Sequence, residues 1–313
     1  MRAIAFQRFG GPEVLTVIEL PTPQARVGEV VVKVAASTVN PTDLMMRSGQ
    51  QAGMMTDLTP PYIAGMEFAG HVHEVGDPSL GLRVGQPVMG IVNPRRPAGG
   101  AHAEYICVPA ASVVPVPDGI DLVEAATVPM NGMTAKMVLE SLALPPRGTL
   151  LITGSAGAVG GYVIALAKKS GLHVIADAKD EDRDLVLRLG ADEVVPRGEG
   201  MHSAVRARHS RGVDGLVDCA LLGDSAAILV RDGGTAVALR KANVITDPRL
   251  RNTHVGVLNE ATNTGALHWI ARLLSEGVLR PRIAVRLPFT QAAEAHSLLG
   301  HGGLRGRVVL TFG

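Results

Sequence analysis

Hydrophobic and polar residues follow two different periodicities along this chain. Short apolar runs separated by glycine and proline fill residues 1 to about 120 and predict strands and turns. From about residue 121, helical and strand patterns alternate, which indicates parallel strands joined by crossover helices. The runs that predict strands are residues 1–7, 30–34, 70–76, 88–92 and 213–218, and a helix is expected over 122–143.

The pattern changes once more near residue 265. A helix over 266–275, a turn at Gly277 and a closing strand over 307–310 are expected. A final antiparallel strand fits a β domain best. We therefore expect a β-rich domain from residues 1–120 and 266–313, with an α/β domain of residues 121–265 inserted. The cleft between them is the expected substrate site.

One glycine-containing segment carries the strongest chemical signal. The apolar run Thr149–Thr153 predicts a strand, and a helix through Lys169 follows it. Small residues between them predict a turn that holds the pyrophosphate of a dinucleotide, although Ala156 stands where a strict G-x-G-x-x-G has glycine. The residues expected to contact the cofactor here are Gly154, Ser155, Ala156, Gly157, Ala158, Val159 and Gly160.

The next predicted strand ends at an acidic residue. Asp177 lies twenty residues after Gly157, where a carboxylate that binds the ribose hydroxyls is expected. The alternative is an ordinary glycine-containing turn, but strand, helix and acid together favour the dinucleotide interpretation.

Composition narrows the function classes. The chain has 313 residues, with 30 basic and 29 acidic side chains and no block of like charge, so neither nucleic acid nor a membrane surface is an expected partner. No apolar run of about eighteen residues is present. The two cysteines, Cys107 and Cys219, are far apart, which argues against a disulfide framework and favours a cytoplasmic location.

Several segments together resemble the medium-chain dehydrogenase/reductase superfamily, and within it the zinc-independent quinone oxidoreductase group. The resemblance covers essentially the whole chain. It implies a Rossmann-type doubly wound parallel sheet domain inserted in a GroES-like β-rich catalytic domain. The segments that carry it are Val39–Asp43, Arg47–Gly49, Gly65–Gly70, Val84–Val88, Gly100–Tyr105, Ala125–Ala135 and Gly306–Leu310.

The resemblance also indicates where zinc ligands would lie in the zinc-dependent members. Asn40 occupies the expected cysteine position, and Met66 stands where a histidine would precede Glu67. No cysteine lies near residues 129–132 or in the loop 93–100. Zinc needs thiolate and imidazole ligands in tetrahedral geometry, so no zinc is expected.

Without zinc, the resemblance implies an NAD(P)H-dependent reductase that transfers hydride to a quinone or another conjugated carbonyl compound. One alternative is an enoyl or alkenal reductase of secondary metabolism. Another is a non-catalytic nucleotide-binding relative, which the intact glycines argue against.

Three further residues are candidates for the site. The resemblance places Asn40 near the nicotinamide, where its amide would donate to a substrate oxygen, and Thr134 against the carboxamide of the nicotinamide. Tyr62 is a candidate proton donor. The alternatives are structural: a turn before Pro41, helix packing for Thr134, and a turn after Pro60 and Pro61 for Tyr62. Asp43 and Arg47 are expected to form an i,i+4 pair.

The sequence leaves the choice of cofactor open. The resemblance implies NADPH, whereas Asp177 argues for NADH because a carboxylate repels a 2′-phosphate. Lys179 and Arg183, or Arg240 with Lys241, could offset that repulsion. An edge strand over 234–239 would permit a homodimer.

Overall fold

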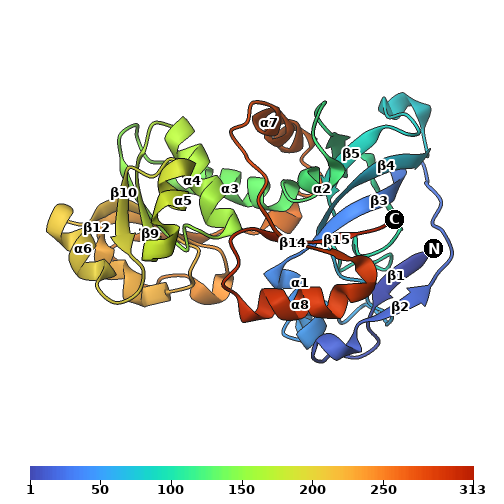
Figure 1. Cartoon of the computed structure of the whole chain (residues 1–313), viewed down its shortest axis with the longest axis horizontal. Coiled ribbons are helices and arrows are strands. Elements are labelled where there is room, and N and C mark those ends of the chain that lie inside the picture. The colour runs from blue at the N-terminus through green and yellow to red at the C-terminus, as the bar shows by residue number, and fades with distance from the viewer. The chain divides into compact units, whose positions relative to one another are not determined.

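The chain is divided between two units, and the computed structural model describes every residue from 1 to 313. Unit 1 consists of Met1–Met130 and Leu258–Gly313, and unit 2 of Asn131–Val257. The sequence placed the corresponding domain borders at 120/121 and 265/266. The first border between the units, after Met130, lies inside helix α3 (Pro129–Leu142), which Figure 1 shows in green.

Unit 1 is built on a seven-stranded sheet and a separate two-stranded one. The large sheet has the order β14-β15-β3-β4-β5-β7, with β6 also paired to β3, and β1 pairs with β2. The strands are β1 (Arg2–Ala5), β2 (Thr16–Glu19), β3 (Glu29–Val39), β4 (Glu67–Val75), β5 (Pro87–Ile91), β6 (Tyr105–Pro109), β7 (Val113–Pro115), β14 (Ile283–Pro288) and β15 (Arg307–Thr311). The helices wholly within this unit are α1 (Pro41–Ser48), α2 (Leu122–Ala125), α7 (Thr264–Ser275) and α8 (Ala292–His301).

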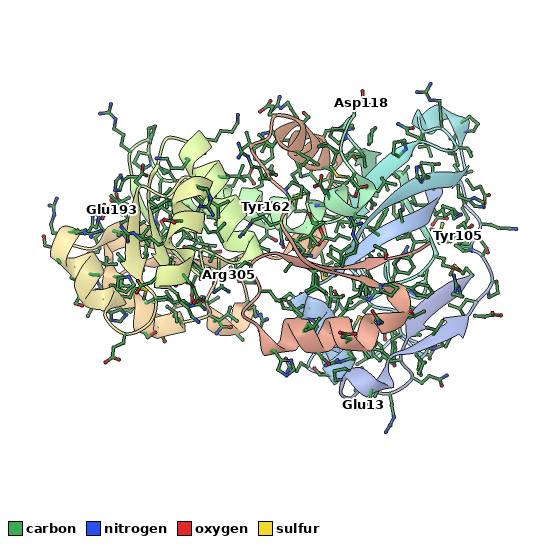
Figure 2. All side chains as sticks on the ribbon, in the orientation of Figure 1. Glu13, Tyr105, Asp118, Tyr162, Glu193 and Arg305 are labelled. Carbon is green, nitrogen blue, oxygen red and sulfur yellow. The ribbon has the colours of Figure 1, made fainter.

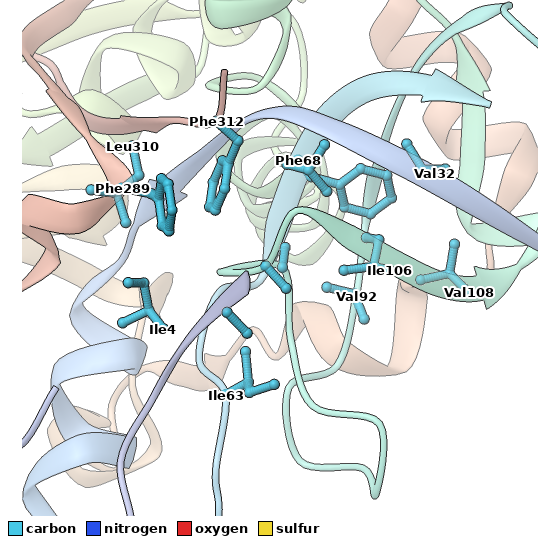
Figure 3. Packing of buried hydrophobic residues seen from close by; sticks show 14 of the residues in the cluster. Ile4, Val32, Ile63, Phe68, Val92, Ile106, Val108, Phe289, Leu310 and Phe312 are labelled. Atoms are coloured by element: carbon cyan, nitrogen blue, oxygen red, sulfur yellow. The ribbon is translucent and has the colours of Figure 1, made fainter. Parts of the chain in front are cut away.

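The core of unit 1 joins both ends of the chain. Phe289 and Phe312 stack with their ring centroids 5.0 Å apart, and Ile4 and Phe68 belong to the same buried cluster (Figure 3). The closing strand β15 pairs antiparallel with β3, as the sequence predicts. Burial of these apolar side chains is what fixes the C-terminal segment to the N-terminal β structure.

Unit 2 is a six-stranded parallel sheet in the order β10-β9-β8-β11-β12-β13. In chain order this is 3-2-1-4-5-6, the doubly wound arrangement of dinucleotide-binding domains, with its switch point between β8 and β11. The predicted fold class is confirmed. Its elements are β8 (Thr149–Thr153), α4 (Ala158–Lys169), β9 (His173–Ala178), α5 (Arg183–Leu189), β10 (Glu193–Pro196), α6 (Met201–Arg208), β11 (Val213–Asp218), β12 (Val230–Ala238) and β13 (Arg251–His254).

The central strand of unit 2 is apolar on both faces. Leu150, Leu151 and Ile152 of β8 are all fully buried, as expected for a parallel strand covered on both sides. Helix α4 packs on β8 and β9, and α5 packs on β9 and β10. This packing fixes the loop between β8 and α4 at the carboxyl edge of the sheet.

Two expectations about individual elements are wrong. The helix expected over 122–143 is interrupted: α2 ends at Ala125, and α3 begins at Pro129. Proline disfavours helical geometry in the residue before it but suits the first position of a helix. The strand over 234–239 is not an edge, because β13 pairs along β12 and forms the edge itself. No helix of the structure has the length and apolar character needed to span a membrane.

Candidate functional site

The loop after β8 turns sharply into α4. Gly154 has a φ of +66°, a left-handed conformation that glycine adopts without strain, and a Cβ there would lie 3.0 Å from the carbonyl carbon of Cys219. The Gly157 N–H donates to the Gly154 carbonyl at 2.9 Å. Helix α4 begins directly afterwards, and an α-helix leaves the N–H groups of its first turn without acceptors inside the helix. The loop therefore presents a helix N-terminus suited to a phosphate.

Gly160 allows α4 to approach this loop closely. A Cβ at Gly160 would lie 2.5 Å from the Gly154 carbonyl oxygen and 2.8 Å from the Ser155 Cα, and both are backbone atoms. Ala156 is buried and fits where the strict motif has glycine. Ala158 and Val159 follow in the first turn of α4 and are partly exposed. The structure thus brings the predicted loop residues together in the geometry of a pyrophosphate-binding turn.

Asp177 lies beneath this loop and not at the exposed end of its strand. Its side chain is 2% exposed, and Oδ1 accepts a hydrogen bond from the Ser155 N–H at 2.9 Å. Oδ2 is 4.0 Å from Nε of Arg197. The last residue of β9 is Ala178, so Asp177 points to the other face of the strand. The expectation that Asp177 binds the ribose is not supported, because its carboxylate braces the loop.

Two cations follow the ends of adjacent strands. Lys179 comes directly after β9 and Arg197 directly after β10, and both side chains are exposed. The Arg197 N–H donates to the Ala178 carbonyl at 2.9 Å, which ties the two strand ends together. Arg197 was missed in the sequence, because Lys179 was chosen for its closeness to Asp177; the short apolar run before Arg197 is the signal that could have found it.

Arg240 lies at a different part of the same edge. It follows β12, and β8 and β11 separate that strand from β9. Neighbouring strands lie about 4.8 Å apart, so β12, which precedes Arg240, is about 14 Å from β9, which precedes Lys179. The structure therefore does not group the two residues at one phosphate. Thr134 lies in α3 and is partly exposed, and its contact with the nicotinamide stays a prediction.

A buried polar cluster occupies the region of Asn40 in unit 1. The Arg307 guanidinium forms an ion pair with Glu67 and also donates to the Thr38 hydroxyl. Asn40 is 4% exposed, and its Oδ1 accepts from Arg307 at 2.9 Å. The Asn40 amide nitrogen lies 3.3 Å from the Thr38 hydroxyl and 3.4 Å from Glu67 Oε1. Both ends of the amide are therefore committed inside the protein.

Asn40 also begins α1, through its backbone. Its N–H donates to Asp43 Oδ2 at 2.7 Å, while Asp43 Oδ1 accepts from the Gly65 N–H at 2.8 Å. The expected pair of Asp43 and Arg47 is wrong, because the carboxylate serves these backbone donors, and Nε and Nη1 of Arg47 have no partner. Burial raises the pKa of the Asp43 carboxyl, although His102, the two N–H donors and Arg307 oppose the increase.

Tyr62 packs in an aromatic cluster of unit 1. Its ring stacks on Phe9 with centroids 5.7 Å apart, and its hydroxyl donates to the Leu58 carbonyl at 3.3 Å. Its backbone N–H also donates to the Phe6 carbonyl. These contacts support the structural alternative for Tyr62 and give no support to a role as proton donor.

Comparisons with known proteins agree with this architecture. A family model described as the alcohol dehydrogenase GroES-like domain matches residues 26–118, and one described as zinc-binding dehydrogenase matches residues 189–310. The mouse quinone oxidoreductase is 28% identical over 99% of this chain and 97% of its own length. The chloroplastic NADPH-dependent alkenal/one oxidoreductase of Arabidopsis thaliana is 28% identical over 99% of this chain and 79% of its own.

A solved structure extends the match to the whole fold. The quinone oxidoreductase from Coxiella burnetii has a TM-score of 0.89 and 28% identity to this chain, covering 100% of this chain and 99% of its own. The chain belongs to the medium-chain dehydrogenase/reductase superfamily. Within it, the chain falls in the quinone oxidoreductase group and is an oxidoreductase. Nicotinamide cofactor binding follows from this membership and is consistent with the loop after β8.

The donors at the zinc positions of the superfamily do not fit zinc in this chain. The groups available there are the Asn40 amide, the buried Met66 thioether and the Glu67 carboxylate, which is already paired with Arg307. The backbone N–H of Met130 donates to the other Glu67 oxygen at 2.8 Å. Tetrahedral zinc sites use cysteine and histidine ligands, and any carboxylate ligand must not be paired with another cation. This set offers neither thiolate nor imidazole.

Proposed function

We propose that this oxidoreductase transfers hydride from NADPH to a quinone or another conjugated carbonyl compound without a zinc ion. The observation that carries the proposal is the set of side chains at Asn40, Met66 and Glu67. The only carboxylate among them, that of Glu67, already forms an ion pair with Arg307. A protein without a Lewis acid at this point must use an acceptor that is already electron-poor. Quinones and α,β-unsaturated carbonyl compounds meet that requirement.

The residues of unit 2 fit the cofactor in the following way. Bound NADPH supplies the hydride from its nicotinamide ring. The Ser155 and Gly157 N–H groups already have acceptors inside the protein. The other backbone N–H groups of the loop from Gly154 to Gly160 hold the pyrophosphate at the N-terminus of α4. Thr134 binds the carboxamide. Asp177 keeps the loop in its binding conformation through the Ser155 N–H.

The preference for NADPH is supported by the side chains at the ends of β9 and β10. Because the Asp177 carboxylate lies beneath the loop, it does not occupy the strand end where it would repel a 2′-phosphate. Lys179 and Arg197 lie at that end instead. The ion pair of Lys179 with Glu181 is 3.8 Å long and exposed on both sides, and such pairs contribute about 1 kcal/mol or less. Lys179 is therefore free to exchange this partner for a phosphate.

Asn40 contributes to the proposed site by positioning. Its amide bridges Arg307, Thr38 and Glu67, and its backbone N–H starts α1. These contacts fix the end of β3 relative to α1. A direct hydrogen bond to substrate is not part of the proposal, because the amide already has its partners.

The acceptor class is tested by cofactor oxidation with a panel of substrates. Benzoquinones, naphthoquinones, 2-alkenals and simple aldehydes are compared by kcat/KM, with and without a chelator. We expect turnover of conjugated acceptors that the chelator leaves unchanged. Efficient reduction of simple aldehydes would reject the acceptor class, and loss of quinone turnover in chelator would reject zinc independence.

The cofactor preference is tested separately. Lys179→Ala and Arg197→Ala each remove a cation that would otherwise contact the 2′-phosphate, so the KM for NADPH should rise about tenfold while that for NADH stays within twofold, since a charged hydrogen bond contributes about 1.5–3 kcal/mol. Arg188→Ala, an exposed arginine of α5, is the matched control. Equal increases in the KM for NADPH and for NADH would show that these cations do not recognise the 2′-phosphate.

An alkenal reductase is the second candidate. It is favoured by the match to the NADPH-dependent alkenal/one oxidoreductase of Arabidopsis thaliana. The same panel separates the two, because a higher kcat/KM for 2-alkenals than for any quinone would support the alkenal assignment.

We also propose a homodimer, although its interface is not the strand over 234–239 that the sequence suggested. On this side of the unit 2 sheet the edge strand is β13, not β12. Pairing of β13 with its counterpart around a two-fold axis would join two sheets edge to edge. Sedimentation of the wild type and of Thr253→Pro, which removes a strand N–H donor, tests this interface.

A further inference from the structure

A cluster of two histidines and a glutamate lies at the amino-terminal edge of the unit 2 sheet. His173 is the first residue of β9, and Glu193 is the first residue of β10, its parallel neighbour. His209 follows the last residue of α6. Figure 2 labels Glu193 beside these elements. Three regular elements thus bring the three side chains to one place.

The potential ligand atoms point toward one another. Glu193 Oε1 lies 2.7 Å from Nε2 of His173 and 3.0 Å from Nε2 of His209. The three ligand atoms all lie within 4.8 Å of one another. Bond lengths of about 2.0–2.2 Å in a tetrahedral zinc site place ligand atoms about 3.3 Å apart, so small side-chain rotations suffice to admit an ion.

We propose that His173, Glu193 and His209 form a binding site for a divalent transition-metal ion, with zinc as the best-suited metal. Two imidazoles and one carboxylate are a common zinc ligand set and also suit nickel and copper, whereas magnesium and calcium prefer oxygen ligands. The side chains of His209 and Glu193 are mostly buried and that of His173 is 38% exposed, which leaves an entry path from solvent. The fourth position is left to water.

Charged side chains surround this set. Arg208 Nη1 lies 3.2 Å from Glu193 Oε2, whereas Oε1 of the same carboxylate contacts both imidazoles. His173 Nδ1 lies 3.8 Å from Asp192, whose carboxylate also binds Lys168. A carboxylate near the second nitrogen of a ligating histidine is the usual outer partner in zinc sites. Arg208 opposes a cation, and its removal should therefore strengthen binding.

This site is remote from the proposed hydride chemistry. His173 and Ala178 are the two ends of β9, about 17 Å apart at 3.3 Å per residue, and the cofactor loop lies at the Ala178 end. An ion here would join β9, β10 and α6 rather than polarise a substrate. Its expected effect is on the stability of unit 2, so the inference is independent of the proposed function.

Calorimetric titration of chelator-treated protein with zinc chloride tests the site. We expect one zinc ion per chain, with affinity reduced at least tenfold in His209→Ala and in Glu193→Gln and increased in Arg208→Ala. His202→Ala, an exposed histidine of α6, is the control and should bind as the wild type does. Equal affinities in wild type and His209→Ala, or a comparable loss in His202→Ala, would overturn the proposal.

Cobalt substitution gives a measurement that does not depend on the variants folding. Cobalt added to the chelator-treated wild type should give the intense visible absorption of a tetrahedral site, and zinc should displace it. The weak absorption of octahedral cobalt, unchanged from that of the free ion, would reject the site. Quinone or alkenal turnover should be the same with and without zinc, which separates this test from that of the proposed function.

Discussion

The Asp177 carboxylate accepts a hydrogen bond from the Ser155 backbone N–H at 2.9 Å and is almost completely buried. The loop that we propose to bind pyrophosphate is therefore braced by the residue that sequence patterns assign to the ribose. Bracing and ribose recognition have different kinetic consequences. A brace affects both cofactors alike, whereas a ribose ligand discriminates between them.

Asp177→Ala should raise the KM for NADPH and NADH together, by about tenfold or more, because a hydrogen bond to a charged acceptor contributes about 1.5–3 kcal/mol. Asp177→Asn should recover most of this loss, since its amide oxygen can still accept from Ser155. Steady-state kinetics with both cofactors measures the two values. A selective gain in NADPH use in Asp177→Ala would instead place the carboxylate at the ribose.

Gly160→Ala should weaken cofactor binding. The added Cβ would lie 2.5 Å from the Gly154 carbonyl oxygen, and backbone atoms cannot move aside as a flexible side chain can. We expect the Kd for NADPH to rise more than tenfold, with a loss of about 1–3 kcal/mol in the stability of unit 2. Fluorescence titration with NADPH and urea unfolding measure the two effects.

Gly256→Ala is the matched control for this change. It lies in the same unit, and a Cβ there would meet nothing within 4 Å. Its cofactor affinity should equal that of the wild type. An unchanged Kd in Gly160→Ala would contradict the close approach of α4 to the loop.

His296 should make unit 1 sensitive to mild acid. The side chain is 1% exposed, and neither ring nitrogen has a hydrogen-bond partner. Burial, the neighbouring His102 ring and the positive charge of Arg47 hold the pKa of His296 well below its ordinary 6.5. The folded protein therefore keeps His296 neutral at a pH where the unfolded chain takes up a proton.

The stability that this histidine contributes is present above pH 6.5 and is lost as the pH falls toward the pKa of the folded state. The loss is about 1.4 kcal/mol per pH unit. As the pH falls from 6.5 toward the pKa of the folded state, the free energy of unfolding of the wild type should fall relative to that of His296→Leu. Urea unfolding followed by the single tryptophan, Trp269 of α7 in unit 1, measures it.

His301→Leu controls for the loss of a histidine from the same helix. His301 is exposed at the end of α8. Its substitution should leave the pH dependence unchanged. If His296→Leu and the wild type lose stability in parallel between pH 6.5 and 5, His296 is not held neutral in the fold.

Sequence patterns predicted most of the fold because burial on a sheet leaves a strong periodic signal. The run at Val213–Asp218 is found as β11 with the same bounds, and the helix expected through Lys169 is α4. Glycines with defined backbone tasks were also recognisable, since Gly154 and Gly160 cannot be replaced without strain or a clash. Both signals are local and require no knowledge of distant residues.

The parts that the sequence did not predict depend on a shift of one residue or on contacts far along the chain. Asp177 and Ala178 point to opposite faces of β9, and the pattern does not show which one is the strand end. The partners of Asn40 include Arg307, which is 267 residues away. The cluster of His173, Glu193 and His209 arises from strand order, which no local pattern encodes.

The buried ion pair between Glu67 and Arg307 should be the most sensitive point of unit 1. Glu67 is fully buried and Arg307 is 7% exposed, so Arg307→Met leaves a carboxylate without its counter-charge in the interior. Breaking one partner of a buried pair costs about 3–5 kcal/mol. Urea unfolding followed by Trp269 should show a loss of this size.

The double variant Glu67→Gln with Arg307→Met distinguishes the charge from the packing. Removing both charges should restore much of the stability lost in Arg307→Met, because the remaining amide can still accept from the Met130 N–H. Arg272→Met, which breaks an exposed ion pair between Arg272 of α7 and Glu276 at its C-cap, should cost about 1 kcal/mol or less. Arg307 of β15 also donates to Asn40. If Arg307→Met costs no more stability than Arg272→Met does, the buried pair does not hold β15 against the residues around Asn40.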